Sequence, residues 1–178
     1  MDSTKDLSLK ICPTELQLHA YIDASYAIHP GSRSHYGIAL CLGSQGFAFH
    51  AKSGAIKVVC RSSTEAELHA ANEASSDILH TVDLLQELRI IQDAVAIFED
   101  KAVIHMMTRN ETNFQIKSKH VRVRYDFLRE QVADGKVVFR SLHIELQLAD
   151  IMTKPLIGEN FFFETASQAT RPTSPARM

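Results

Sequence analysis

The sequence predicts an α/β domain built on a mixed β-sheet, and three observations support this fold class. Residues 17–59 form short apolar runs separated by turn-forming residues, which is typical of antiparallel strands. From residue 62 to about residue 90 the apolar residues recur at helical spacing instead. Short apolar runs at 94–98 and 136–142 then alternate with helical patterns, which favours two further strands, of which the one at 94–98 has the composition of a buried strand.

The antiparallel part is expected to consist of three strands, over residues 17–24, 36–42 and 46–52. The second and third strands are separated by the turn-prone sequence Gly-Ser-Gln-Gly. Between the first and second strands, residues 29–34 read His-Pro-Gly-Ser-Arg-Ser, a composition that predicts a surface loop. Arg33 in this loop and the nearby His35 are therefore expected to be free to face a ligand.

The long amphipathic helix expected from Ser62 to about Ile90 begins with the pattern of a capping box. In this pattern the Ser62 hydroxyl accepts a hydrogen bond near the helix start, and the Glu65 carboxylate reaches back to the backbone N–H of Ser62. Glu65 thus has a structural role, whereas Glu67 points to a different side of the helix and is left for chemistry. The inward-facing residues are expected to be Leu68, Ala71, Ser75, Ile78, Val82 and Leu85.

The second half of the chain is expected to place helices around two further strands. The strand at 94–98 ends in Glu99-Asp100, and a short helix follows to about residue 107. Residues 115–135 predict an amphipathic helix that Gly135 closes. A last short helix, over residues 146–154, stops before Pro155. The inward-facing residues of the 115–135 helix are expected to be Val121, Tyr125, Leu128 and Val132.

The composition fits one globular domain. The chain has 178 residues, of which 45% are hydrophobic, and a formal charge of −2, so any nucleic-acid surface must be local. Cys12, Cys41 and Cys60 have no close ligand spacing, which favours buried thiols in a reducing compartment over disulfides or zinc.

Four acidic residues lie in four separate predicted elements: Asp23, Glu67, Asp100 and Asp150. In a mixed sheet whose first strand is central, Asp23 would lie beside Asp100, and the two helices could bring Glu67 and Asp150 near them. Four clustered carboxylates repel one another unless cations neutralise them, which predicts bound Mg²⁺ or Mn²⁺. Taken singly, each acid is better explained as a turn former, a helix cap or a solvated side chain. Only the joint pattern indicates a metal site.

The segments YIDASYA, SSTEAELHA, FED, SKHVRVRYDFLRE and QLADIMTKPL resemble the ribonuclease H domain of copia-type retrotransposon Pol polyproteins, the domain that follows the reverse transcriptase. The resemblance covers about residues 5–160. It implies a ribonuclease H-like fold, in which a five-stranded mixed sheet has three antiparallel strands, then two strands parallel to the first, with helices on both faces.

The same resemblance implies the activity and the site. The reaction would be hydrolysis of the RNA strand of an RNA/DNA hybrid during reverse transcription, with two bound Mg²⁺ ions or, in their place, Mn²⁺. The catalytic and metal-binding residues would be Asp23, Glu67, Asp100 and Asp150. His143, which precedes the last helix, is a further candidate for proton transfer, although a loop histidine is more often a surface group.

The resemblance also implies domain boundaries and partners. Residues 1–16 would be a linker from a polymerase region and residues 17–158 the ribonuclease H-like domain, whereas the Ser, Thr and Pro content of the chain end predicts a disordered tail over residues 159–178. The RNA/DNA hybrid and the reverse transcriptase of the same polyprotein would be the partners. With no apolar run suited to a signal peptide or a membrane span, we expect the protein to act inside the cell, in cytoplasmic virus-like particles or in the nucleus.

One basic segment is the candidate nucleic-acid contact. Residues 117–130 hold five Lys and Arg side chains against two acids. Phosphate contacts made by such a segment would be independent of sequence and sensitive to salt, but a solvated helix face explains the same charges. The residues expected to contact nucleic acid are Arg33, Lys117, Lys119, His120, Arg122 and Arg124.

Two alternatives to an active ribonuclease H remain open. The first is a fragment that keeps the fold and weak nucleic-acid binding without activity. It is favoured by Lys101, a cation beside the expected metal site, by the start of the chain just before the similar region, and by an atypical tail. The second is a DNA nuclease or integrase-like enzyme on the same fold, which only the resemblance disfavours.

Overall fold

The structure is a computed structural model that describes residues 15–43, 48–99, 101–108, 118–142 and 146–154. Three residues with predicted roles, Asp100, Lys117 and His143, lie outside the described residues. So do nearly all of the predicted linker and the whole of the predicted tail.

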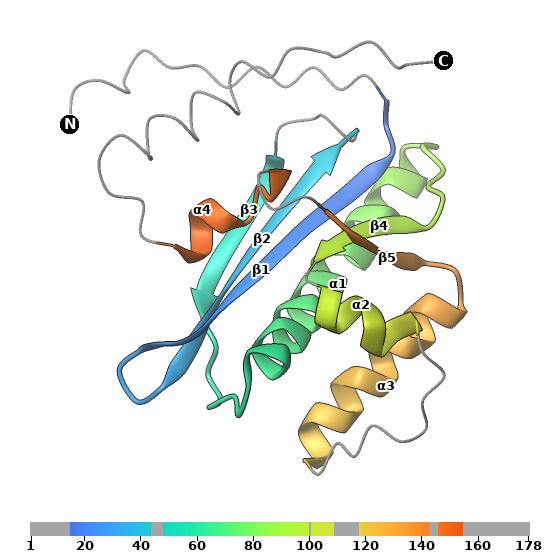
Figure 1. Ribbon diagram of the computed structural model, residues 1–178. Helices are drawn as coiled ribbons and strands as arrows, with labels where there is room; N and C mark the ends of the chain where they lie inside the picture. The colour runs from blue at the N-terminus through green and yellow to red at the C-terminus, as the bar shows by residue number, and fades with distance from the viewer. Residues whose placement is uncertain (1–14, 44–47, 100, 109–117, 143–145, 155–178) are drawn as a thin grey trace, which may run out of the picture.

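A five-stranded mixed sheet forms the centre of the protein, with the strand order β3-β2-β1-β4-β5 (Figure 1). β1 pairs antiparallel with β2, and β2 with β3, whereas β4 and β5 run parallel to β1. This order confirms the predicted fold class. The strands are β1 (Leu18–His29), β2 (Arg33–Leu42), β3 (Ala48–Ala55), β4 (Val95–Glu99) and β5 (Val137–Ser141).

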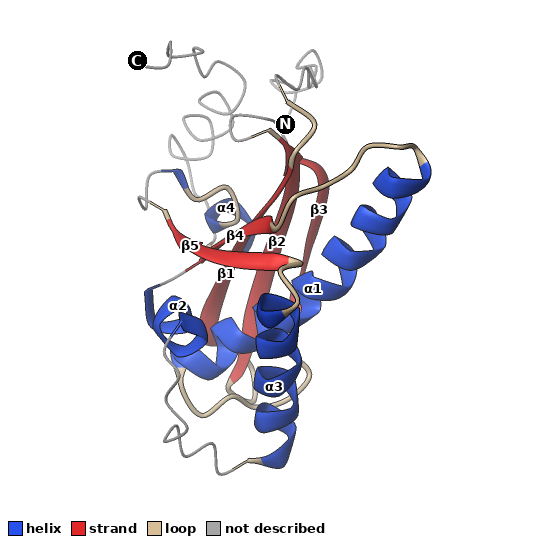
Figure 2. Cartoon of the chain, turned by 90° about the vertical axis from the view of Figure 1, so that its right-hand side faces the viewer, coloured by secondary structure: helices blue, strands red, loops and turns tan. Residues whose placement is uncertain are grey.

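The helices cover the two faces of the sheet unequally, and Figure 2 shows the three longer ones gathered together. They share a large apolar core with Leu18, Ala20 and Ile22 of β1, whereas α4 belongs to a smaller cluster that includes Tyr21. No described helix combines the length and apolar character of a membrane span. The helices are α1 (Ser63–Glu87), α2 (Lys101–Thr108), α3 (Lys119–Ala133) and α4 (Asp150–Thr153).

The start of α1 is capped nearly as predicted. The Ser62 hydroxyl accepts a hydrogen bond from the Glu65 N–H at 3.1 Å. The Glu65 carboxylate, however, accepts from the N–H of Arg61 at 2.9 Å, one residue before the predicted partner. The predicted inward stripe is confirmed: Leu68, Ala71, Ser75, Ile78 and Leu85 are buried, and Val82 packs against them.

The hairpin between β1 and β2 differs from the predicted surface loop. Both strands continue into it, and His29 still pairs with Arg33. A register shift after Ser25 accommodates the extra residues, and Ala27 has a positive φ of 55°. The Ala27 N–H donates to the hydroxyl of buried Ser34 at 3.1 Å, so a β-bulge precedes the turn, and the predicted surface loop is shortened to the exposed residues 30–32.

His35 is not free to face a ligand, which corrects the prediction made for it. Its Nδ1 lies 2.7 Å from Nε2 of His29, within hydrogen-bonding distance. Burial lowers the pKa of His35, and the neighbouring His29 lowers it further. Arg33 remains exposed at the start of β2.

α3 packs as its sequence pattern predicts. Val121 and Leu128 are buried, and Tyr125 and Val132 pack against the large core. Gly135 has a positive φ of 69°, and its N–H donates to the Val132 carbonyl at 3.1 Å. A glycine therefore ends this helix because the backbone enters the left-handed region there.

The two described cysteines are buried, as predicted. Cys41 lies in β2, and Cys60 lies just before α1. Burial raises the pKa of the Cys60 thiol, which keeps it protonated and unreactive near neutral pH.

Candidate active site

Asp23 lies on the face of β1 that α4 covers. Side chains alternate along a strand, so Asp23 faces the same side as Tyr21, which packs in the cluster near α4. Asp23 pairs with Gly37 of β2. On the other side of β1, the last described pair with β4 is Tyr21–Phe98. From Asp23 onward, β1 therefore extends past the described pairing with β4.

α4 is held directly against Asp23. The hydroxyl of Thr153, a buried residue, donates a hydrogen bond to the Asp23 carboxylate. The Ser25 hydroxyl, two residues further along β1, donates to the Thr153 carbonyl at 2.9 Å. These two contacts join the end of α4 to the strand that carries Asp23.

Gly37 makes this close approach possible. A Cβ atom at position 37 would lie 3.0 Å from the Ala149 carbonyl oxygen, from the Met152 Cβ and from the Thr153 Cγ2. Any larger residue would therefore push α4 away from β2. Because Gly37 pairs with Asp23, the place where Gly37 lacks a side chain lies next to Asp23.

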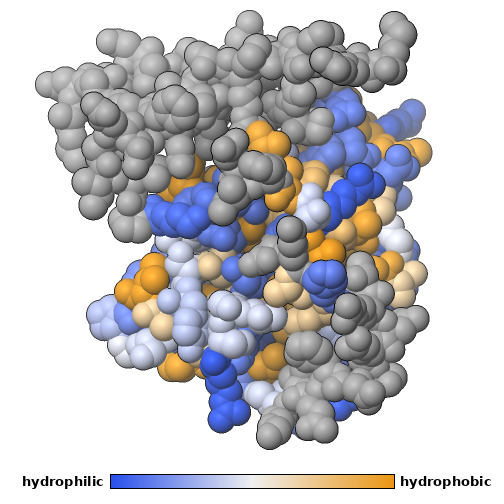
Figure 3. All heavy atoms as spheres, in the orientation of Figure 1, coloured by the Kyte–Doolittle hydropathy of each residue, from blue (hydrophilic) through white to orange (hydrophobic). Residues whose placement is uncertain are grey.

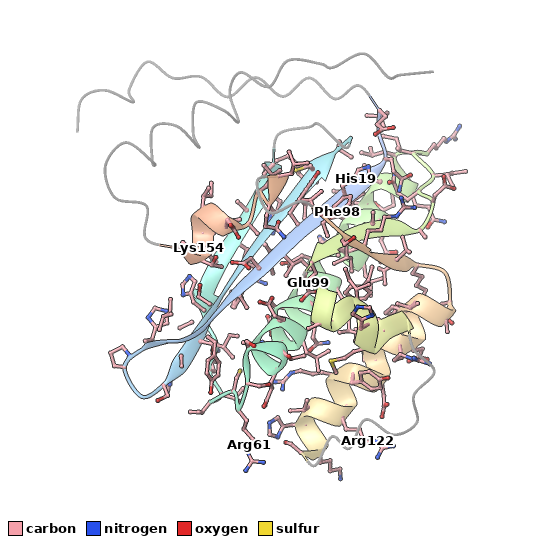
Figure 4. The ribbon with its side chains drawn as sticks, in the orientation of Figure 1. His19, Arg61, Phe98, Glu99, Arg122 and Lys154 are labelled. Carbon is pink, nitrogen blue, oxygen red and sulfur yellow. The ribbon has the colours of Figure 1, made fainter. Side chains whose placement is uncertain are left out.

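Asp23 and Asp150 interact electrostatically. Burial raises the pKa of Asp23, the negative charge of Asp150 raises it further, and the Thr153 hydroxyl and the Lys154 ammonium act in the opposite direction. Lys154 is labelled beside α4 in Figure 4, and its Nζ lies 2.5 Å from an Asp150 oxygen. In Figure 3 hydrophilic atoms lie next to hydrophobic ones in the region of α4. Two carboxylates that repel each other in a partly buried position form a site that a divalent cation would stabilise.

The convergence of Glu67 and Asp100 on this pair stays a prediction. Glu67 is buried in α1, which packs on the opposite face of the sheet from α4. Among the described residues, no three His, Cys, Asp or Glu side chains form a group that could hold a metal ion. Because Asp100 and His143 lie outside the described residues, the convergence of four acids stays a prediction.

Several residues of the site escaped the sequence analysis. Thr153 and Lys154 lie one helical turn after Asp150, and this spacing was the available signal for them. Glu99, at the end of β4 in Figure 4, is buried, although only the neighbouring acid was singled out. Gln147 also contributes, because its side-chain amide donates to the carbonyls of Ile22 and Phe98 at 2.9 and 3.4 Å. No local pattern in the sequence marks such a long-range contact.

The elements that carry the described candidates for nucleic-acid contact lie toward one end of the protein. In Figure 1 the β1–β2 hairpin extends to the lower left, and the first turns of α1 and α3 lie at the lower end. Lys119, His120 and Arg122 are exposed there. His120 Nε2 is 3.8 Å from Glu65 Oε1. Figure 4 shows Arg61, an exposed cation that the sequence analysis missed, at the same end as Arg122.

Arg124 is directed toward the start of α1 rather than fully into solvent. It is half-buried, and its positive charge acts on His69 and Cys60. Burial lowers the pKa of His69, and Arg124 lowers it further. Arg124 therefore lies close enough to His69 and Cys60 to affect their pKa values, and it is less exposed than Lys119 and Arg122.

Comparison of the sequence with known proteins finds relatives among polyproteins, although no family model matches the chain. It is 36% identical over 148 residues to the retrovirus-related Pol polyprotein from transposon RE1 of Arabidopsis thaliana, covering 79% of this chain and 10% of that protein. It is 29% identical over 166 residues to the transposon Ty1-LR3 Gag-Pol polyprotein of Saccharomyces cerevisiae, covering 90% of this chain and 9% of that protein. The chain thus spans about a tenth of the length of these relatives.

Solved structures share the fold. LC11-RNase H1, isolated from compost by a metagenomic approach, matches with a TM-score of 0.57 at 16% identity, over 77% of this chain and 92% of that one. The same protein in complex with an RNA/DNA hybrid matches with a TM-score of 0.56 at 16% identity, over 76% and 93% of the two chains. At this identity the likeness concerns the architecture, which is that of ribonuclease H.

Proposed function

We propose that this chain, which belongs to the retrovirus-related Pol polyproteins of transposons, is a metal-dependent endoribonuclease of a copia-type element. The chain matches one segment of these polyproteins and has a ribonuclease H-like fold. Its substrate would be the RNA strand of an RNA/DNA hybrid. The observation that carries the proposal is the Asp23–Asp150 pair, which α4 assembles on β1 of this fold.

The side chains around Asp23 fit a hard divalent cation. Carboxylate oxygens are the ligands that Mg²⁺ and Mn²⁺ prefer, and the mutual repulsion of Asp23 and Asp150 favours a bound positive charge. These two residues would hold the metal, with Glu67 and Asp100 as further ligands. When bound, Mg²⁺ or Mn²⁺ supplies the Lewis acidity that hydrolysis of a phosphodiester requires.

The residues around the two acids would orient and balance them. The Thr153 hydroxyl fixes the direction of the Asp23 carboxylate through its hydrogen bond. Lys154 neutralises Asp150 through their ion pair, and it provides a positive charge that a substrate phosphate could also contact. Arg61, just before α1, and the cations at the first turn of α3 would hold the hybrid through its phosphates, without regard to sequence. The reverse transcriptase of the same polyprotein would deliver that hybrid.

The purified chain is expected to cut the RNA strand of an end-labelled RNA/DNA hybrid when Mg²⁺ or Mn²⁺ is present. A chelator should stop the cleavage, because the two acids alone cannot stabilise the developing charge. Gel analysis of both labelled strands measures the result. Hybrid binding without cleavage would support the inactive fragment, and cleavage of duplex DNA would support the DNA nuclease.

Removing two cations from the first turn of α3 is expected to weaken binding of the hybrid. The double variant Lys119→Gln with Arg122→Gln removes two exposed positive charges, so fewer counterions are released when the hybrid binds. The slope of log affinity against log salt should become shallower by roughly two. Fluorescence anisotropy at several salt concentrations measures this slope.

A charge-matched control for this variant is the pair Lys136→Gln and Arg140→Gln. Both positions are exposed and lie beyond the C-terminal end of α3. The control should leave the salt slope unchanged. An equal effect of both double variants would show that binding responds to net charge and not to the first turn of α3.

A further inference from the structure

Gln147 connects three segments that meet at the acid pair. Its Nε2 donates to the Ile22 carbonyl at 2.9 Å and to the Phe98 carbonyl at 3.4 Å. Its Oε1 accepts from the Ala149 N–H at 3.4 Å. The Ile22 and Phe98 carbonyls can accept only from the nitrogen of the Gln147 side-chain amide, and the Ala149 N–H can donate only to its oxygen. These partners therefore define the orientation of the Gln147 amide.

The two carbonyls lie where the parallel strands β1 and β4 stop pairing. The last described pair between these strands is Tyr21–Phe98. The Ile22 carbonyl belongs to the peptide group that leads directly into Asp23. Because a peptide group is planar, holding this carbonyl also fixes the backbone nitrogen and Cα of Asp23. Gln147 therefore supplies hydrogen bonds at the end of the β1–β4 ladder.

The same residue fixes the segment that carries Asp150. The Gln147 carbonyl accepts from the Asp150 N–H at 3.4 Å. The two residues between them, Leu148 and Ala149, are buried against Tyr21 and its neighbours in the smaller core cluster. One side chain thus ties the start of α4 to the backbone of both parallel strands.

We propose that Gln147 is a positioning residue that sets the separation of Asp23 and Asp150 and thereby the affinity of the site for a divalent cation. This inference rests on the proposed function, because it assumes that the two acids bind the metal. Residues that orient metal ligands commonly change metal affinity or activity by about 10- to 100-fold when they are replaced.

Gln92, in the segment before β4, offers a matched control that contacts the other end of β1. Its Oε1 accepts from the Leu18 N–H at 2.7 Å, and its Nε2 donates to the Leu16 carbonyl at 3.0 Å. It therefore also holds the backbone at β1 through its side-chain amide, but at the end of the strand that is remote from Asp23. Loss of either amide should lower the melting temperature to a similar extent.

The test compares Mn²⁺ binding to the parent, Gln147→Met and Gln92→Met by calorimetry without nucleic acid. Methionine has nearly the shape of glutamine but cannot donate a hydrogen bond. Gln147→Met is expected to weaken Mn²⁺ binding by about 10-fold or more, whereas Gln92→Met should bind Mn²⁺ like the parent. With hybrid present, Gln147→Met should lower kcat and leave KM unchanged, since the phosphate contacts remain.

The parent measurement separates the two proposals. If the parent binds Mn²⁺ and Gln147→Met binds it equally well, the role of Gln147 is overturned and the proposed function stands. If the parent neither binds Mn²⁺ nor cleaves the hybrid, both are overturned. Should Gln147→Met fail to fold, Gln147→Asn keeps the amide on a side chain too short to reach both carbonyls. Unchanged Mn²⁺ affinity in that variant would overturn the inference as well.

Discussion

Replacing Asp23 with asparagine is expected to abolish the Mg²⁺-dependent cleavage of the hybrid. Asparagine keeps the size of the side chain and can still accept the Thr153 hydrogen bond, but it removes the negative charge that would bind the cation. Losing a metal ligand removes several kcal/mol of transition-state stabilisation, which corresponds to a rate loss of about 10³-fold or more. Single-turnover cleavage with excess enzyme measures this loss directly.

The same substitution is expected to stabilise the fold when divalent cations are absent. Burial, and then Asp150, raise the pKa of Asp23, so the folded protein holds the proton more tightly than the unfolded chain does. The contribution of Asp23 to stability is therefore present below its usual pKa and is lost as pH rises through the raised pKa. At neutral pH the ionised carboxylate opposes folding, and asparagine removes that effect.

Thermal unfolding checks this expectation against pH and metal. The melting temperature of Asp23→Asn should exceed that of the parent at pH 7 with a chelator present, and the difference should disappear near pH 3, where both side chains are neutral. Added Mg²⁺ should raise the melting temperature of the parent only, because the ligand binds the folded state of that protein.

Asp83→Asn, an exposed position on α1, is the matched control for Asp23→Asn. It should match the parent in cleavage, melting temperature and response to Mg²⁺. Cleavage by Asp23→Asn at the rate of the parent would mean that Asp23 does not belong to the active site.

Most of the fold could be predicted because periodicity and chain order determine it. The inward stripe of α1 and the position of Asp23 in a central strand follow from residues close together in sequence. The β-bulge at Ala27 could not be predicted, since it depends on a hydrogen bond to Ser34 across the hairpin. The shift of the Glu65 hydrogen bond to Arg61 likewise depends on how the chain enters the helix.

The candidate site was predictable only in part. The motif around Asp150 indicated an acid in a short helix near the edge of the sheet, and the strand order of a mixed sheet predicted that Asp23 lies beside Asp100. The residues that hold this helix against the sheet could not be identified from the sequence, because their partners are far away along the chain. Gln147 contacts the Ile22 carbonyl 125 residues earlier, and Gly37 is revealed only by the atoms that a side chain would displace.

Replacing Gly37 with valine is expected to displace α4 and to damage both stability and activity. The Cβ of valine would lie 3.0 Å from the Ala149 carbonyl oxygen, which is backbone and cannot rotate away, and two more methyl groups would add to the clash. Overpacking of this kind costs about 1–3 kcal/mol, and the preference of valine for strands does not offset it. Urea unfolding measures the loss of stability.

The activity of Gly37→Val should fall further than its stability alone explains. A shift of α4 separates Thr153 from both Asp23 and Ser25. The hydrogen bonds that hold the helix of Asp150 against the strand of Asp23 are then lost. We expect Mn²⁺ affinity to decrease by about 10-fold or more at a temperature where the variant is fully folded.

Gly54→Val in β3 provides the same substitution at a strand glycine for comparison. A Cβ at position 54 would meet the Tyr36 ring at 3.2–3.3 Å, and this side chain can move. Gly54→Val should therefore lose some stability while it keeps the Mn²⁺ affinity of the parent. If Gly37→Val also kept that affinity, the packing of α4 against β2 would not determine how Asp23 and Asp150 bind the cation. Because Gly37 pairs with Asp23, only the Gly37 variant should change both the packing of α4 and the binding of Mn²⁺ at Asp23.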